Sequence, residues 1–238
     1  MDRQQRIVPA VILGVLLALG MYAAGIQLTE AVRVWKQTDR VVSVKGLSER
    51  DVAVDLVLWP ISFSVASQTL DGLHAELRTA EEKIRAFLLA HGFSEEEISV
   101  TQPVVSDRWE HFYGDNKPEE RYTASGVVLL RTGKVEQAKA VMPRADDLVR
   151  EGVLLSRSYE HQPQFIFTRL NDIKPEMIAE ATHEARKAAE QFAQDSGSRV
   201  GKIRSAQQGY FSIENLDPYT PDIKRVRVVT TIEYYLLD

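Results

Sequence analysis

Hydrophobic residues alternate with polar ones after about residue 40, a pattern typical of β-strands. The alternation predicts a short strand over residues 41–46 and a longer one over 52–65. Its phase shifts by one residue at Trp59-Pro60, and we expect a β-bulge there because such a shift moves side chains to the other face of a sheet. Pro60 has no N–H to donate, so we expect it at a sheet edge or in the bulge.

Three segments carry hydrophobic residues at steps of three and four, which predicts amphipathic helices. These segments are residues 70–87, 135–148 and 178–192, followed by glycines that can end a helix, Gly92, Gly152 and Gly197. Pro143 should interrupt or kink the second helix. The expected buried stripe of the third helix comprises Ile178, Ala181, Ala185, Ala188 and Phe192.

The remaining hydrophobic runs predict further strands. Residues 98–113 and 122–132 should form a hairpin, and later strands are expected at 153–167 (with a bend at Pro163), 203–211 and 226–236. The resulting order is β-β-α-β-β-α-β-α-β-β. Strands that follow one another without a helix favour antiparallel pairing, so the predicted fold class is α+β, a mainly antiparallel sheet packed with three helices.

An uncharged segment, residues 7–29, follows Arg3 and Arg6. Its apolar part, residues 7–26, matches the roughly 20 residues of a membrane-spanning helix and exceeds the roughly 7–15 apolar residues of a signal peptide. We therefore expect a retained transmembrane helix before the fold, with a cleaved signal sequence as the alternative. The expected parts are an anchor or signal sequence, a linker and a folded domain, at residues 1–27, 28–40 and 41–238.

Small residues recur every four positions in this segment, at Ala10, Gly14 and Ala18. Such spacing lets two membrane helices approach closely, which makes these residues candidates for membrane-helix packing. The alternative is that Ala and Gly are simply common in such segments. The expected location is the cytoplasmic (inner) membrane, crossed once, with the domain facing the periplasm. If the leader is cleaved, the alternative is a soluble periplasmic protein.

Composition narrows the class of protein. Hydrophobic residues make up 44% and charged residues 26% of the chain, which excludes a disordered protein. The formal net charge is −5, and a basic surface for nucleic acid is therefore not expected. The absence of cysteine excludes disulfides, thiolate metal sites and a thiol nucleophile. It also fits an oxidising compartment.

One stretch carries a resemblance to a known family. Residues 180–193, EATHEARKAAEQFA, followed by Gly197 and by residues 200–203, VGKI, resemble the SIMPL-domain family of bacterial periplasmic and membrane-anchored proteins. Gly92-Phe93 and the RYTAS motif at residues 121–125 add weaker matches, and the resemblance covers roughly residues 41–237. It implies a role in envelope stress, including oxidative stress, and oligomeric assembly. It supplies no catalytic residue.

Residues with catalytic or metal-binding potential form no recognised motif. The histidines lack zinc-site spacing, and no Gly-x-Ser-x-Gly elbow occurs. Residues 95–97, three successive glutamates, are interpreted as the acidic first turn of a short helix after a capping residue, Ser94. We therefore expect no enzyme, no metal and no cofactor, while an enzyme whose site converges only in three dimensions stays an alternative.

Aromatic residues gather near the tip of the predicted hairpin, which has little core of its own to bury them. The candidate interface residues are Trp109, Phe112, Tyr113 and Tyr122. The main hypothesis is a membrane-tethered envelope protein that acts by self-association, as a homo-oligomer, or by binding an unidentified envelope protein. The alternative is a periplasmic ligand-binding module, with an aromatic-lined pocket around Trp109 and Phe165.

Overall fold

The computed structural model describes residues 14, 16–27, 40–110, 117–156 and 161–237, and the chain divides into two compact units. Unit 1 takes its described residues from 1–49, 175–211 and 227–238, and unit 2 from 50–174 and 212–226. Three elements contribute residues to both units: β1 (Val41–Ala53), α5 (Leu170–Asp195) and β10 (Ile223–Leu237).

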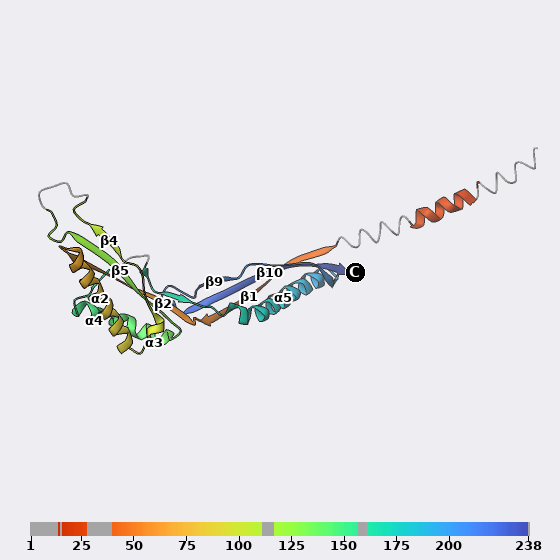
Figure 1. Ribbon diagram of the computed structural model, residues 1–238. Helices are drawn as coiled ribbons and strands as arrows, with labels where there is room; N and C mark the ends of the chain where they lie inside the picture. The colour runs from red at the N-terminus through yellow and green to blue at the C-terminus, as the bar shows by residue number, and fades with distance from the viewer. Residues whose placement is uncertain (1–13, 15, 28–39, 111–116, 157–160, 238) are drawn as a thin grey trace, which may run out of the picture. The chain divides into compact units, whose positions relative to one another are not determined.

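Unit 1 is built from strands with α5 along one face (Figure 1). β10 lies between β1 and β8 (Arg199–Gln208) and pairs antiparallel with β8, while β9 (Ser212–Asn215) of unit 2 also pairs with β10. The core joins Val44 of β1 and Ile232 and Tyr234 of β10 to alanines of α5. On β1, the residues between the buried positions are exposed, as in antiparallel sheets with one solvated face: Ser43, Lys45, Leu47 and Glu49.

The buried stripe of α5 differs from the expected one. Ala181 and Ala185 are buried as predicted, but the stripe continues through Ala189 and Ala193, and Phe192 is 59% exposed. The stripe begins with Met177, and the predicted Ile178 and Ala188 are only partly buried. From residue 181 on, its buried members are alanines, which lets the helix backbone come close to the sheet, and a phenylalanine at that contact would hold the two apart.

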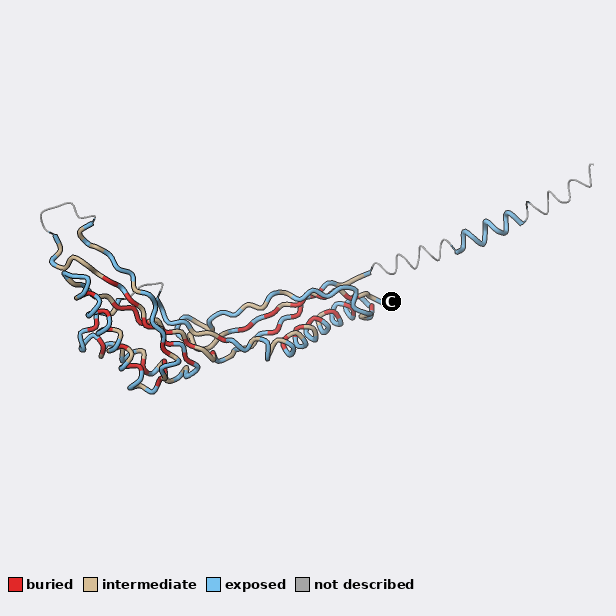
Figure 2. The backbone as a smooth tube through the Cα atoms, in the orientation of Figure 1, coloured by how far each residue is buried: buried red, intermediate tan, exposed pale blue. Residues whose placement is uncertain are grey.

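Unit 2 centres on β2 (Leu56–Ser67) and β5 (Tyr122–Thr132), which pair antiparallel. β3 (Ile98–Val100) and β4 (Val104–Asp107) pair with β5, whereas β6 (Leu154–Leu155) and β7 (Gln164–Ile166) pair with β2. Three helices lie on one face (Figure 1): α2 (Leu70–Ala90), α3 (Val135–Val141) and α4 (Asp146–Arg150). Two 3-10 turns, η1 (Glu95–Glu97) and η2 (Met142–Ala145), belong to the same unit. Figure 2 shows the buried residues between this face and the helices.

The α+β class with antiparallel sheets is confirmed, but the number and order of elements differ. The second predicted helix divides into α3, η2 and α4 around Pro143, where an interruption was expected. Of the strand predicted over residues 98–113, the described residues form β3 and β4, and residues 111–113 lie outside the described residues. Of the strand predicted over 153–167, the described residues form β6 and β7, and residues 157–160 lie outside them. Gly92, Gly152 and Gly197 follow their helices with φ of 84°, 88° and 69°, which confirms them as helix ends.

The predicted bulge at Trp59-Pro60 is wrong. β2 and β5 pair without a shift from Val57 opposite Thr132 to Ser67 opposite Tyr122. The change of phase instead falls at the break between β1 and β2. Pro60 lies between the stretches of β2 that pair with β7 (residues 56–58) and with β6 (residues 63–64), and no described residue pairs with it on that side, which its missing N–H allows.

The predicted anchor extends beyond the described residues. Residues 16–27 are helical, and the described part of the chain contains no helix that is both long and apolar enough to cross a membrane. Gly14 and Ala18 of the small-residue stripe are described, and Ala10 lies outside the described residues.

Candidate functional site

The β4–β5 hairpin holds a charged pair at its base. Arg121 donates from Nε and Nη2 to Oδ2 of Asp107, over 3.0 and 2.8 Å. The backbone N–H of Trp109 donates to the other oxygen, Oδ1, over 2.9 Å. The Arg121 guanidinium, followed by the Trp109 N–H, holds the pKa of Asp107 below its ordinary value. Both oxygens of the Asp107 carboxylate therefore accept hydrogen bonds from the same hairpin.

Trp109, a predicted interface residue, is half-buried in the hairpin. Its Nε1 donates to the Pro118 carbonyl over 3.1 Å, and Lys117 Nζ and Arg121 Cζ lie 5.1 and 5.2 Å from the ring centroid. Tyr122 packs partly against the core of unit 2, with Arg121 Cζ 4.9 Å from its ring. Arg121 thus brings Trp109 and Tyr122 together. Of the other predicted interface residues, Phe112 and Tyr113 lie outside the described residues.

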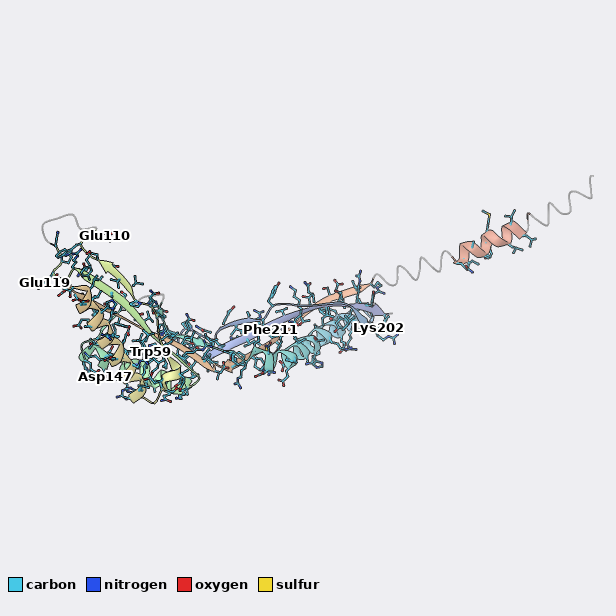
Figure 3. All side chains as sticks on the ribbon, in the orientation of Figure 1. Trp59, Glu110, Glu119, Asp147, Lys202 and Phe211 are labelled. Carbon is cyan, nitrogen blue, oxygen red and sulfur yellow. The ribbon has the colours of Figure 1, made fainter. Side chains whose placement is uncertain are left out.

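The edge of the sheet beside this hairpin is apolar. Val104 and Val105 of β4 are 69% and 46% exposed, and in the described ranges β4 pairs only with β5. Glu110 and Glu119 flank the hairpin tip at the same end of unit 2 (Figure 3). Sequence reasoning missed the two valines because residues 98–113 read as one strand. The signal was Pro103, which interrupts that run just before two adjacent valines.

A pocket of about 690 Å³ opens in unit 2 beside residues 59–62 of β2. Directly after β6, the Ser156 N–H donates to the Ser62 carbonyl over 2.8 Å, and Gln164 of β7 pairs with Leu58. The pocket lies beside the β2 residues between these points. Its described lining is Trp59, Pro60, Ile61, Ser62, Met142, Pro143, Ala145, Asp146, Leu155, Ser156, His161, Gln162 and Pro163.

This pocket is not the one that the sequence suggested. Phe165 packs partly against the core of unit 2, and Trp109 lies in the hairpin; neither is among the described lining residues. Trp59 is an aromatic residue of the described lining. Pro60 and Pro163 were the available signal, because two residues without an N–H, one on each side of an edge pairing, mark where that pairing cannot form.

The glutamate run has a structural role at one position. Glu97 accepts hydrogen bonds from the Ser94 N–H, the Thr132 hydroxyl and the Lys134 ammonium, over 2.8, 2.5 and 3.1 Å. Burial by itself raises the pKa of Glu97, but these three donors outweigh it and lower the pKa to about 2. Glu97 therefore links η1 to the end of β5. Over the ranges that the structure describes, no cluster of three or more His, Asp or Glu side chains could hold a metal ion.

Comparison with known proteins gives one finding. The model of the family described as "SIMPL: Protein of unknown function (DUF541)" matches residues 42–230, most of the chain and parts of both units. No curated protein matches the chain.

Proposed function

We propose that this chain, which belongs to the SIMPL family, is a non-enzymatic, membrane-tethered envelope protein that acts by self-association or by binding a protein partner. The observation that carries the proposal is the exposed apolar edge at Val104 and Val105 of β4. A strand edge presents backbone N–H and C=O groups that another chain can pair with, which makes an apolar edge a template for association.

Within β4 itself there is no lysine, no proline and no register shift. Proteins commonly block edge strands with lysines, inward-pointing charges or bulges. The sequence of β4 is VVSD, and its one charge, Asp107, is engaged by Arg121 in the same hairpin. A second strand added to β4 would therefore meet two valines and a serine without displacing a free charge.

Trp109 adds an anchor close to the same edge. Its indole is held by the Pro118 carbonyl and two cations, so it is ordered before any partner arrives. Aromatic side chains that are fixed in advance lose little entropy on binding, and tryptophan is enriched among the residues that dominate interface energies.

The proposed membrane tether and its location rest on the sequence and on the family resemblance. The apolar segment at residues 7–26 supports a retained anchor in the cytoplasmic membrane with both units in the periplasm, and the family resemblance supports a role in envelope stress. Amino-terminal sequencing of the mature protein tests the tether. A mature protein that begins at Met1 or Asp2 agrees with a retained anchor. A mature protein that begins near Met21 or Ile26 would show a cleaved, freely soluble periplasmic protein.

Substitutions at Val105 can distinguish association through the backbone of β4 from association through its side chains. The Arg108 N–H donates to the Arg121 carbonyl over 2.8 Å, so residues 104, 106 and 108 direct their backbone groups to β5. Val105 consequently directs its N–H away from β5. Val105→Pro removes this outward donor without taking a hydrogen bond from the β4–β5 pair, and Val105→Ala keeps the donor while removing most of the side chain.

The experiment measures the mass of the full chain in detergent micelles by light scattering, from 1 to 50 micromolar. We expect an oligomer whose dissociation constant rises at least tenfold in Val105→Pro and less in Val105→Ala. Leu154→Ala, which removes an exposed apolar side chain at β6 and keeps the N–H that faces β2, is the control and should associate like the wild type. A monomeric wild type would overturn self-association, and a Val105→Pro variant that associates normally would place the interface elsewhere.

A further inference from the structure

We infer that the partner of the β4 edge is a second copy of this chain, paired antiparallel about a two-fold axis that passes beside Val105. The inference rests on the proposed function and names the partner at that same edge. It is carried by the order of backbone donors and acceptors along the outward side of β4, which is complementary to itself.

Backbone alternation determines which groups face outward from β4. Residues 104, 106 and 108 direct their N–H groups to β5, and the last of these donates to the Arg121 carbonyl over 2.8 Å. The N–H groups of Val105 and Asp107 therefore face the opposite side. In a trans peptide the carbonyl points opposite to the N–H of the next residue, so the carbonyls of Pro103, Val105 and Asp107 face outward as well.

Two of these positions differ from an ordinary strand edge. Pro103 presents a carbonyl but has no N–H. Asp107 presents an N–H, while its carbonyl already accepts from the Glu110 N–H over 3.3 Å in the turn after β4. Val105, between them, presents both groups, and neither has a partner within the described residues. The outward edge therefore presents an acceptor at Pro103, a donor and an acceptor at Val105, and a donor at Asp107.

This order matches its own reverse. In an antiparallel pair, every second pair of facing residues exchanges two hydrogen bonds. When Val105 faces the second copy's Val105, these two residues exchange both bonds, and the Asp107 N–H of each copy faces the Pro103 carbonyl of the other. The N–H that Pro103 lacks would have faced the Asp107 carbonyl, which Glu110 already supplies. Every outward donor of both copies thus finds an acceptor.

Other arrangements leave a backbone group unpaired. An ordinary strand would place a carbonyl opposite Pro103, where no donor meets it, and a buried acceptor without a donor is destabilising. Moving the second copy by two residues would set Pro103 opposite Val105, whose carbonyl would then lose its donor. The donor pattern therefore favours a second copy with Val105 at the centre over an unrelated strand.

The side chains agree with this register. The two Val105 side chains lie next to each other on one face, and Val104, which is 69% exposed, lies opposite Ser106 of the other copy. Asp107 lies opposite Pro103, so the two aspartates do not face each other. Because each copy uses the same edge, pairing occupies both edges and association at this site stops at two copies.

Introduced thiols report on the register, because the chain has no cysteine. Residue 104 faces residue 106 of the second copy with Cα atoms about 4.5 Å apart, and residue 105 faces its own copy at about 5.5 Å. Both distances lie in the roughly 4.4–6.8 Å range of disulfides. Two residues 104 are diagonal neighbours about 7–8 Å apart, outside that range, and so are two residues 106.

Full-length Val104→Cys, Val105→Cys and Ser106→Cys are oxidised with copper phenanthroline in detergent micelles, singly and as an equimolar mixture of the first and the third. Each rate of disulfide formation is divided by the rate at which the same thiol reacts with a dipyridyl disulfide, which corrects for exposure and ionisation. We expect Val105→Cys and the mixture to cross-link at least tenfold faster than Val104→Cys or Ser106→Cys alone. Leu154→Cys, 65% exposed on β6, is the control and should cross-link no faster than these two.

Adding Val105→Pro to both members of the mixture should lower its cross-linking rate to that of the single variants, whereas Val105→Ala, which keeps the N–H, should retain most of it. Fast cross-linking of Val104→Cys or Ser106→Cys alone would place the axis elsewhere and overturn the inference. Slow cross-linking of Val105→Cys and of the mixture, in a chain that still associates through β4, would overturn the inference and leave the proposed function standing. A monomeric wild type would overturn both the inference and the self-association on which it rests.

Discussion

Gly46 of β1 and Ala181 of α5 lie so close that a Cβ atom on residue 46 would stand 1.7 Å from the Ala181 carbonyl oxygen. The same atom would lie 2.6 Å from the backbone nitrogen of Ala185. Two residues further along β1, the Ser48 hydroxyl donates to Glu180 over 2.7 Å. Strand and helix of unit 1 therefore meet backbone to backbone, with glycine on one side and alanine on the other.

Gly46→Ala should destabilise unit 1 severely. The obstructing atoms belong to the helix backbone and cannot turn aside, so we expect the free energy of unfolding to fall by at least about 3 kcal/mol, the upper range of over-packing. Urea unfolding of the full chain, followed by circular dichroism, measures this change.

Gly133→Ala is the matched control, because its Cβ would meet only the Asp55 carbonyl oxygen at an ordinary 3.5 Å. It should leave the free energy of unfolding unchanged or raise it by about 0.4–1 kcal/mol through the unfolded chain. If Gly46→Ala is as stable as Gly133→Ala, the close contact between β1 and α5 does not exist in solution.

Gly126 of β5 faces Phe63 of β2, and a Cβ there would lie 2.6 Å from Cζ of the ring. Phe63 is fully buried, so Gly126→Ala should cost about 1–3 kcal/mol. Here the obstacle is a side chain, and Phe63→Leu should relieve it. In a double-mutant cycle, the cost of Gly126→Ala should drop below about 1 kcal/mol in the Phe63→Leu background. Additive effects would contradict the contact.

Glu97 should make the stability of unit 2 depend on pH in the acidic range. Its pKa is about 2 in the folded chain and near 4.5 when unperturbed, so its contribution to stability is fully present above pH 4.5 and is lost as the pH falls toward 2. Glu97→Gln should lower the free energy of unfolding at pH 7 by about 1–3 kcal/mol, since it weakens three hydrogen bonds to a charged group.

The difference between Glu97→Gln and the wild type should shrink as the pH is lowered from 5 to 2.5, measured by urea unfolding at each pH. Glu96→Gln, at the exposed neighbouring position, is the control and should follow the wild type at every pH. A difference that is constant with pH would mean that the Glu97 charge does not stabilise the fold.

Proline should be tolerated at residue 60 and not at its partner. Pro60→Ala adds an N–H on the side of β2 where no described residue pairs with residue 60 and keeps all pairing with β5, so we expect a change of no more than about 1 kcal/mol. Leu129→Pro, opposite Pro60 on a strand paired on both sides, should cost about 3 kcal/mol or more. If the two substitutions lower the free energy of unfolding by similar amounts, Pro60 stabilises β2 in a way that its lack of a partner on one side does not explain.

Local patterns were sufficient for much of unit 2 and for the ends of its helices. The period of the apolar residues located α2 from Leu73 to Phe87, and Gly92 and Gly152 marked helix ends because a positive φ costs glycine little. Pro143 was expected to interrupt the second helix, and η2 lies there. These features depend on residues within a few positions of one another.

The candidate sites could be predicted only in part. Trp109 and Tyr122 were singled out from composition near a turn, yet their shared contact with Arg121 and the engagement of Asp107 depend on the hairpin register. The exposure of Val104 and Val105 depends on which strands β5 and β2 accept as neighbours. The pocket beside residues 59–62 of β2 brings together lining residues of β2 and η2, which are distant in the chain.

The sequence by itself determined the α+β class, the main helices and the family, because periodicity, turn residues and a recognisable helix motif are local properties of the chain. Tertiary structure alone decided the register and the neighbours. The alternation at Trp59-Pro60 suggested a bulge, whereas β2 pairs with β5 there without a register shift. The helix period suggested Phe192 for the buried stripe of α5, whereas Ala189 and Ala193 are buried and Phe192 is exposed. Which face is buried depends on the shape of a partner segment distant in the chain, and no local period encodes that shape.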